Sequence, residues 1–585
     1  MRYRALLMLF VLLALASAMP AQSALVARPA AVAPSVASYQ IEATLDPIAK
    51  TVAGAERITY TNPSSDTLNE IWLRLYLRAF RDANTTWMRE YGRWSAATLP
   101  PDRVGDISLE HLALADGTDL LASATLTDTL LRVPLPQPLL PGQSLELDAT
   151  WISKLPRVFA RTGYGGRADS FFMVGQWYPK MAVYDRGRWD TEPWHANAEF
   201  FHDFGSYDVR VTVPQSYVVA GVGVPSSETN NPDGTRTLRF TADDVTDFAF
   251  AASPEFLTRM VKSSGVGIAL YYMPEHGAAA DAYLGVAAEA LQLYGSWYGA
   301  YPYPRLTIVD VPDDATAAGG MEYPTLVTSE VGGSASSTSW LAYITAHEIG
   351  HQWWPMQTAT DEAAEPWLDE GLTEYTGIRY MADSQRGWTA SGAVAFEQSL
   401  YAPRAGLSAT LPAWRYTDGQ YSVVYAKPAL GLWTLEGVIG PERFRQAMAA
   451  YLSEYRFKHP SGADFRAVLE RELGGLGWLF DDYLSSGGMI DYAVGKLEHS
   501  DIASTVLIVR KGVVRVPIEI LITFRSGAQQ LQTWDGQAPS LELAFAGRNT
   551  VVRAEVDPFR KLKAELNRLD NSVGVWQVRV PMWMA

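Results

Sequence analysis

The feature that most constrains this chain is the stretch from Trp340 to Tyr375, which reads WLAYITAHEIGHQWWPMQTATDEAAEPWLDEGLTEY. Within it, His347 and His351 lie four residues apart in a segment without proline. On a helix both imidazoles therefore project from one face, about one turn apart. This spacing is typical of two ligands to one metal ion.

Glu348 completes the pattern H-E-x-x-H, in which two histidines bind zinc and the glutamate acts as a general base. A catalytic zinc ion usually takes three protein ligands and keeps a fourth position for water. Glu370 is the candidate third ligand, because 18 residues (369 − 352 + 1) separate it from His351. That length accommodates a loop and the start of a second helix with Pro366 in its first turn.

The alternative is a pair of surface histidines on an amphipathic helix. The neighbours of the motif are apolar, so we expect the histidines to be at least partly buried; these neighbours are Leu341, Tyr343, Ile344, Ile349, Trp353 and Trp354. Buried polar groups need partners. With a glutamate available in a second helical segment, a zinc site is the favoured interpretation.

Three motifs in order connect the chain to a known family. H-E-x-x-H is followed after 18 residues by a glutamate within W-L-D-E-G and preceded by A-G-G-M-E-Y at 318–323. This arrangement resembles the aminopeptidase N family of gluzincin metallopeptidases. The resemblance implies a thermolysin-like catalytic domain with one Zn²⁺ per chain, held by His347, His351 and Glu370. It also implies that Glu348 is the general base.

The same resemblance assigns the segment before the helix to substrate binding. Glu322 matches the glutamate that holds the free α-amino group of the substrate, with a loop backbone formed by Gly319, Gly320 and Met321. Tyr323 stands where the family has asparagine. The chemistry agrees, because an enzyme that removes amino-terminal residues needs a fixed anion for an ammonium group. The alternative is that Glu322 is a solvated loop charge.

The resemblance also implies a tyrosine that stabilises the oxyanion of the tetrahedral intermediate. Tyr425 matches it in Y-A-K-P, where Pro428 replaces the usual glycine. A phenol aimed at the developing charge meets the physical requirement. Tyr421, one helical turn earlier, is the rival.

Two further residues receive roles. Glu374 lies one turn after Glu370 and is placed to reach back to a ligand histidine, because such histidines usually donate their second N–H to a carboxylate or carbonyl. A solvent-exposed helix carboxylate is the alternative. By resemblance, Gln176 in G-Q-W-Y-P matches a glutamine of the amino-terminal domain that faces the substrate amine.

Composition excludes several other classes of protein. The formal net charge of −16 argues against a nucleic-acid binder, whose binding surface would be basic. The chain has no cysteine, so disulfides, thiolate zinc ligands and a cysteine nucleophile are excluded. A metal must be held by histidine and carboxylate.

The amino-terminal residues predict export. Arg2 and Arg4 precede an apolar run at 5–16 and a small-residue cleavage site at 16–18, so residues 1–18 are interpreted as a signal peptide and 19–38 as a flexible linker. The apolar run is shorter than the roughly 20 residues of a spanning helix. An uncleaved membrane anchor is the alternative. We otherwise expect no membrane segment and a location in the periplasm or outside the cell.

The rest of the chain is expected to be a multidomain α+β protein. Alternating runs such as 207–213, with turns at 141–142 and 231–234, predict an antiparallel β domain at 39–262, which resembles the family's β-saddle. A mainly helical catalytic domain follows at 263–488, with helices expected at 279–298, 428–438, 442–455 and 463–484. A strand is expected at 305–311, and an edge at the G-G-M-E-Y segment that follows it could receive a peptide as another strand.

The last region, 489–585, is rich in Val and Ile and predicts a small β-sandwich, with a turn at 511–512 joining strands 505–510 and 513–524. Long members of the family continue into a helical superhelix that caps the active site. The sequence does not continue in this way, and we expect a more open cleft.

The sequence thus predicts a secreted zinc aminopeptidase acting on peptides. Two alternatives stay open. One is an endopeptidase or other hydrolase on the same zinc site. The other is a catalytically silent scaffold that binds a peptide, although such relatives typically lose a ligand or the base.

Overall fold

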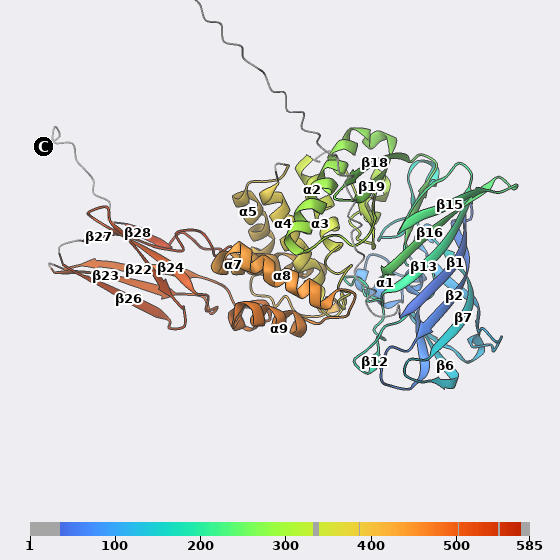
Figure 1. Cartoon of the computed structure of the whole chain (residues 1–585), viewed down its shortest axis with the longest axis horizontal. Coiled ribbons are helices and arrows are strands. Elements are labelled where there is room, and N and C mark those ends of the chain that lie inside the picture. The colour runs from blue at the N-terminus through green and yellow to red at the C-terminus, as the bar shows by residue number, and fades with distance from the viewer. Residues whose placement is uncertain (1–35, 332–337, 385, 501, 548–549, 575–585) are drawn as a thin grey trace, which may run out of the picture. The chain divides into compact units, whose positions relative to one another are not determined.

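The computed structural model describes residues 36–331, 338–384, 386–500, 502–547 and 550–574 (Figure 1). The predicted signal peptide and most of the predicted linker lie outside these residues. Among the described residues, no helix combines the length and the apolarity that crossing a membrane requires.

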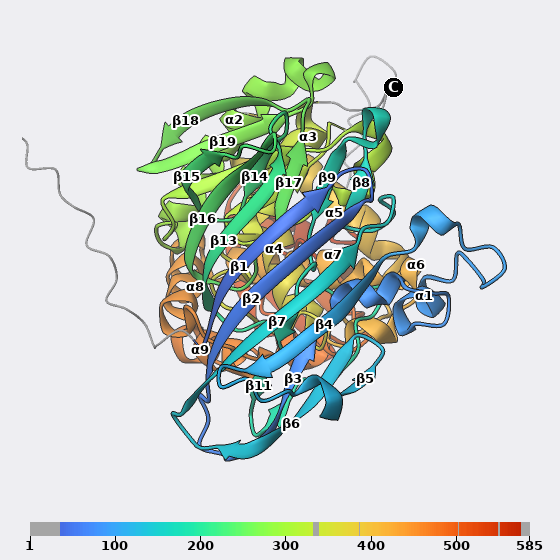
Figure 2. The ribbon, with the colours of Figure 1, turned by 90° about the vertical axis from the view of Figure 1, so that its right-hand side faces the viewer.

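A seven-stranded sheet forms much of the amino-terminal region (Figure 2). Its order is β15 (Val224–Asn230), β16 (Thr235–Val245), β13 (Gly205–Pro214), β1 (Ala37–Asp46), β2 (Thr51–Thr61), β7 (Ser144–Lys154) and β4 (Asp106–Leu114). Strand β13 alternates buried and half-buried side chains, as the pattern at 207–213 predicts. The predicted turn at 231–234 joins β15 to β16.

Two four-stranded sheets and a short ribbon complete this region. One sheet contains β10 (Lys180–Met181), β3 (Leu68–Arg74), β6 (Leu130–Leu139) and β5 (Thr125–Thr127). The other contains β14 (Val218–Gly221), β17 (Phe250–Ser253), β9 (Phe171–Val174) and β8 (Gly163–Gly165). The ribbon pairs β11 (Tyr184–Asp185) with β12 (Arg188–Trp189), and helix α1 spans Thr86–Tyr91. The aromatic segment around Trp177 is buried in the core. The Trp177 indole N–H donates to the Phe248 carbonyl at 3.0 Å.

A mixed sheet then leads to the helices. Its order is β18 (Leu257–Ser263), β19 (Val266–Tyr272), β20 (Arg305–Asp310) and β21 (Leu326–Ser329). The predicted boundary between 262 and 263 falls inside β18. The strand predicted at 305–311 is β20, which pairs with β19 on one side and β21 on the other, and β21 is the last described strand of this sheet. Met321 forms an isolated bridge to Thr328, so the 320–321 segment lies along the outer side of β21.

The helical region contains α2 (Ala280–Tyr298), α3 (Thr338–His351), α4 (Leu372–Asp383), α5 (Ala390–Tyr401), α6 (Asp418–Tyr421), α7 (Val423–Ile439), α8 (Pro441–Tyr455) and α9 (Gly462–Leu473). Two predictions need correction. Helix α7 begins before Pro428, which lies inside it. The helix predicted at 463–484 is broken, because Gly474 has a φ of +96° and a separate π-helical turn covers Trp478–Leu484.

The carboxyl-terminal region has two sheets. The first contains β22 (Tyr492–His499), β23 (Ala503–Arg510) and β26 (Ser540–Ala546). The second contains β25 (Gln529–Trp534), β24 (Ile518–Phe524), β27 (Val551–Val556) and β28 (Ser572–Gly574). The predicted hairpin across 511–512 is wrong, because β23 and β24 belong to different sheets. Pro517 lacks the N–H that a strand ladder needs, and β24 starts directly after it.

Candidate metal centre and cleft

Helix α3 carries His347, Glu348 and His351, and all three side chains are buried. The helix is fixed from two sides. The Tyr294 hydroxyl of α2 donates to the Ala346 carbonyl at 2.9 Å, and the Thr345 and Ser329 hydroxyls lie 3.1 Å apart, which connects α3 to β21. The two histidines are buried, as the sequence predicts.

Glu370 comes from a π-helical turn at Trp367–Gly371 that continues into α4. Gly371 allows this turn to lie against α7, because a Cβ atom at that position would be 2.5 Å from the Pro428 Cβ and 2.9 Å from the Val424 carbonyl oxygen. The close approach brings the Glu370 carboxylate to α3.

Three donor atoms converge where the two helices meet. The Nε2 atoms of His347 and His351 are 3.2 Å apart, and each lies 3.4 Å from Oε2 of Glu370. A tetrahedral zinc ion with ligand bonds of about 2.0–2.1 Å requires ligand atoms about 3.3 Å apart. Oε2 of Glu370 is buried and has no hydrogen-bond partner among the described residues. The donor set therefore fits one Zn²⁺ ion.

Carboxylates also fix the far side of each imidazole. Nδ1 of His347 lies 2.8 Å from Oε2 of Glu374. Nδ1 of His351 forms a hydrogen bond of 2.9 Å with the Trp354 carbonyl oxygen and lies 2.7 Å from Oδ1 of Asp369. Protons on the Nδ1 atoms leave the Nε2 lone pairs facing each other, which is the tautomer a metal needs. Burial lowers the pKa of His347, but contacts with Glu370 and Glu374 outweigh it and raise that pKa to about 10. The carboxylates around the imidazoles thus favour a positive charge here, whether a proton or a metal ion carries it.

Asp369 was not assigned a role from the sequence, although it precedes Glu370 in W-L-D-E-G. Replacing it with asparagine is expected to weaken zinc binding about 10–100-fold, because outer partners of metal-bound histidines have effects of this size. Competition with a chelator of known affinity measures the change. The matched control is Asp383→Asn at the end of α4, which should bind zinc like the unmutated protein; equal affinities for both variants would contradict the role of Asp369.

The metal centre opens into a cleft of about 500 Å³. Its walls include nine of the residues singled out in the sequence: Gly319, Gly320, Met321, Glu322, His347, Glu348, His351, Glu370 and Tyr425. Burial raises the pKa of Glu348 above its ordinary value, although the two histidines lower it in part. Its Oε2 atom has no hydrogen-bond partner among the described residues, so this carboxylate is available to a molecule in the cleft.

The loop before β21 is held against α3 by Gln352, another residue that sequence reasoning missed. Its amide Nε2 donates to the carbonyls of Glu322 and Tyr323 at 3.2 and 3.1 Å, and its Oε1 accepts from the Thr325 N–H at 2.8 Å. Gly320 has a φ of +64°, which favours glycine, and a Cβ atom at this position would lie 3.6 Å from Oε1 of Glu348. Gln352 follows His351 directly, so the ligand helix also fixes this loop.

Glu322 lies beside the metal ligands and is 5% exposed. One of its carboxylate oxygens is within 4.8 Å of both a Glu348 oxygen and a His351 nitrogen. Burial, with a contribution from Glu199, raises the pKa of Glu322 to about 8. Glu199 also lines the cleft and forms an ion pair with Arg161. Neither Glu199 nor Arg161 stood in a recognisable motif.

Tyr425, rather than its rival Tyr421, lines the cleft. Its hydroxyl donates to Oε1 of Glu370, and its ring lies 6.0 Å from the His347 ring at an interplanar angle of 25°. The Tyr421 hydroxyl is buried without a hydrogen-bond partner among the described residues. The geometry thus brings Tyr425 to the metal centre.

Gln176 does not reach the cleft. Its side chain is buried and its amide donates to Oδ2 of Asp247 at 2.8 Å, away from the residues that line the cleft. Tyr323, which stands where the family has asparagine, packs its hydroxyl against Gly175, where a Cβ atom would lie only 2.1 Å away. In the amino-terminal region, Glu199 is the acidic side chain that faces the cleft instead.

Comparison with known proteins gives a consistent result. The model of the peptidase family M1 domain matches residues 283–483. Aminopeptidase M1-B of Oryza sativa is 30% identical over 215 residues, which are 33% of this chain and 23% of the relative. Glutamyl aminopeptidase of Rattus norvegicus is 22% identical over 438 residues, which are 70% of this chain and 42% of the relative. The chain therefore spans less than half the length of these two relatives.

Solved structures share the fold. An M1 zinc metallopeptidase of Deinococcus radiodurans superposes with a TM-score of 0.54 and 21% identity, covering 75% of this chain and 91% of that protein. Aminopeptidase A of Legionella pneumophila, solved in complex with aspartic acid, gives a TM-score of 0.64 and 16% identity, covering 91% of this chain and 59% of that protein.

Proposed function

The chain carries a peptidase family M1 domain of the aminopeptidase N type of gluzincins, and from that premise we propose that it is a zinc-dependent aminopeptidase acting on peptides. One observation carries the proposal: a single cleft is lined by the three metal-donor atoms, by the free carboxylate Glu348 and by the buried carboxylate Glu322. A mutant of the Deinococcus protein has been solved with the peptide Tyr-Ser-Ala, which supports peptides as the substrate class.

In the proposed reaction, the chain supplies an acid–base group and two binding groups. A zinc ion held by His347, His351 and Glu370 would supply a Lewis acid that activates water and polarises a carbonyl group. Glu348 accepts a proton from the attacking water and delivers it to the leaving amine. The Tyr425 hydroxyl donates a hydrogen bond to the developing oxyanion. Glu322 holds the ammonium group at the end of the peptide, which sets the point of cleavage.

Glu322 is the residue that separates an aminopeptidase from an endopeptidase on the same centre. We expect Glu322→Gln to raise KM for a peptide with a free amino end about 10–100-fold, since a hydrogen bond to a charged group contributes about 1.5–3 kcal/mol. Hydrolysis of Tyr-Ser-Ala and of its amino-acetylated form by both proteins measures the effect. Glu330→Gln, a half-buried carboxylate just after β21, is the control. Equal cleavage of both peptides by the unmutated protein would favour the endopeptidase.

Export is part of the proposal, and it rests on the apolar run at 5–16 and the small residues that follow it. Amino-terminal sequencing of the protein from the native host should find Met19 as the first residue. An intact Met1 on protein that sediments with membranes would favour the uncleaved anchor.

A further inference from the structure

Three buried carboxylates gather on the side of Glu322 that faces the amino-terminal region. Glu199, Glu322 and Glu362 are each less than a tenth exposed, and one oxygen of each lies within 4.8 Å of the other two. Glu362 comes from the segment between the second histidine ligand and the third ligand, and no motif draws attention to it.

The cations near this cluster are already paired. Arg161 forms its ion pair with Glu199, and the ammonium of Lys180 lies 2.5 Å from Oδ1 of Asp247. His202 stays neutral, because burial and the charge of Lys180 lower its pKa well below the usual value. Among the described residues, none forms an ion pair with Glu322 or Glu362. In their ionised form these two buried carboxylates lack a counter-ion, and burial accordingly raises the pKa of both. A cationic ligand would stabilise the ionised form.

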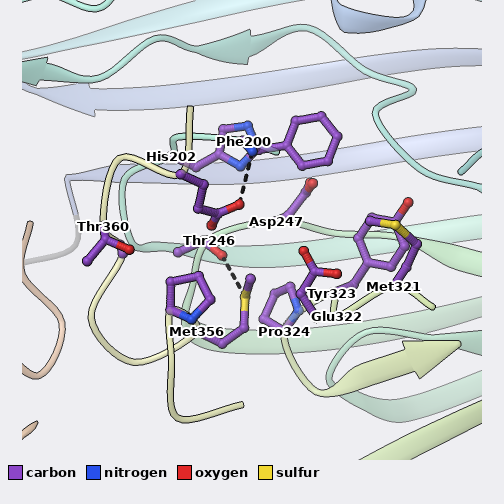
Figure 3. Close-up of a pocket in the computed structure, with 13 residues that line it drawn as sticks. Phe200, His202, Thr246, Asp247, Met321, Glu322, Tyr323, Pro324, Met356 and Thr360 are labelled. Atoms are coloured by element: carbon purple, nitrogen blue, oxygen red, sulfur yellow. Dashed lines mark hydrogen bonds between the residues drawn. The ribbon is translucent and has the colours of Figure 1, made fainter. Parts of the chain in front are cut away.

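Glu322 provides an independent indication of a ligand. Its carboxylate makes no hydrogen bond or ion pair to any described residue, although the side chain is 95% buried. It lines both the cleft and a smaller cavity behind it, and Figure 3 shows the side chain pointing into that cavity. Glu362 lines the same cavity, whose volume of about 20 Å³ leaves room for roughly one water molecule. Glu322 therefore connects Glu362 with the metal centre.

The spacing of the three oxygens suits an ammonium group. Because the three oxygens lie within 4.8 Å of one another, each is at most about 2.8 Å from the centre of their triangle, and a nitrogen at or above that centre can lie a charge-assisted N–H···O bond length of about 2.8 Å from all three. An ammonium group has three N–H donors, one for each carboxylate. Glu362 is held in this position by the Phe200 N–H, which donates to its Oε2 at 3.0 Å.

We propose that Glu362 is a specificity-determining residue that, together with Glu199 and Glu322, completes a three-carboxylate site for the amino-terminal ammonium of the substrate. The inference rests on the proposed aminopeptidase function and adds a residue to it. Glu199 and Glu322 face the cleft, and Glu362 closes the site from behind. A peptide whose amino end is acylated would bury the two unpaired carboxylates without a counter-ion, so the cluster also works against internal cleavage.

The test measures binding without turnover in zinc-loaded Glu348→Gln protein. Calorimetry compares Tyr-Ser-Ala with the analogue in which a hydroxyl replaces the α-amine. Adding Glu362→Gln is expected to weaken binding of the amine about 10-fold or more and to change binding of the hydroxyl analogue less than about twofold. Glutamine can still accept from the Phe200 N–H, so the substitution removes charge while keeping the anchor. Unchanged binding of the analogue reports an intact cleft.

Two further variants sharpen the result. Glu362→Asp keeps the charge and should retain part of the lost amine affinity. Glu365→Gln, three residues along and bonded to the Gly462 N–H outside the cluster, should retain all of it. If amine selectivity survives Glu362→Gln, or if both ligands weaken equally, the inference is overturned while the proposed function stands. If the protein without the Glu362 substitution binds both ligands equally, the proposed amine recognition fails, and the role of Glu362 fails with it.

Discussion

Replacing Glu348 with glutamine is expected to lower kcat about 10²–10⁴-fold while zinc stays bound, because a positioned general base contributes an acceleration of this size. Glutamine has nearly the same shape as glutamate but cannot accept a proton. Glu348 is not one of the three converging donor atoms, and its Oε2 atom has no hydrogen-bond partner among the described residues, so the substitution should disturb neither the metal ligands nor the packing of α3.

The measurement combines steady-state hydrolysis of an aminoacyl fluorogenic substrate with the zinc content of the same sample. Glu442→Gln on α8, an exposed position, is the matched control and should retain full activity. Activity of Glu348→Gln within about tenfold of the unmutated protein, with zinc bound, would remove the general-base role.

Replacing Glu370 with alanine is expected to weaken zinc binding by more than about 100-fold and to abolish turnover at ordinary zinc concentrations. Even outer partners of zinc ligands change affinity about 10–100-fold, and Glu370 is one of three direct donors. Without it, two imidazoles remain, and Tyr425 loses the carboxylate that its hydroxyl contacts.

Competition with a chelator gives the zinc affinity, and a zinc titration of activity shows whether turnover returns at high metal concentration. Glu365→Gln again serves as a control on the same segment, because its carboxylate bonds Gly462 rather than a histidine. Zinc affinity that is unchanged in Glu370→Ala would show that another group is the third ligand.

The metal centre could be predicted from the sequence because its geometry is mostly local. A spacing of four residues on one helix fixes His347 relative to His351, and an 18-residue connecting segment brings Glu370 to them. Glu374 could be predicted for the same reason, since one helical turn places it behind His347. Asp369 was visible in the motif, but its role depends on the π-helical turn that directs Asp369 and Glu370 to the same histidine.

Three other residues that were missed meet through contacts between distant segments. Arg161, Glu199 and Glu362 meet only after the amino-terminal sheets pack against the helical region, and no sequence spacing encodes that contact. Gln176 was misjudged for the same reason, because its amide is taken by Asp247, 71 residues away.

The predictions of secondary structure divide in a similar way, into local patterns that succeeded and a strand pairing that failed. Strand β13 and helix α2 have strong periodic patterns, and the structure has them within one or two residues of the predicted bounds. The hairpin expected at 511–512 failed because two adjacent runs of Val and Ile do not reveal whether they pair with each other or with strands elsewhere. Pro517 was the available signal that the second run starts later.

The most direct test of the central claim is a crystal structure with anomalous diffraction measured on both sides of the zinc absorption edge. The account predicts one peak per chain, within about 2.0–2.2 Å of Nε2 of His347, Nε2 of His351 and a carboxylate oxygen of Glu370. An active crystal with no zinc peak between these three side chains, or with its zinc held by other residues, would contradict it.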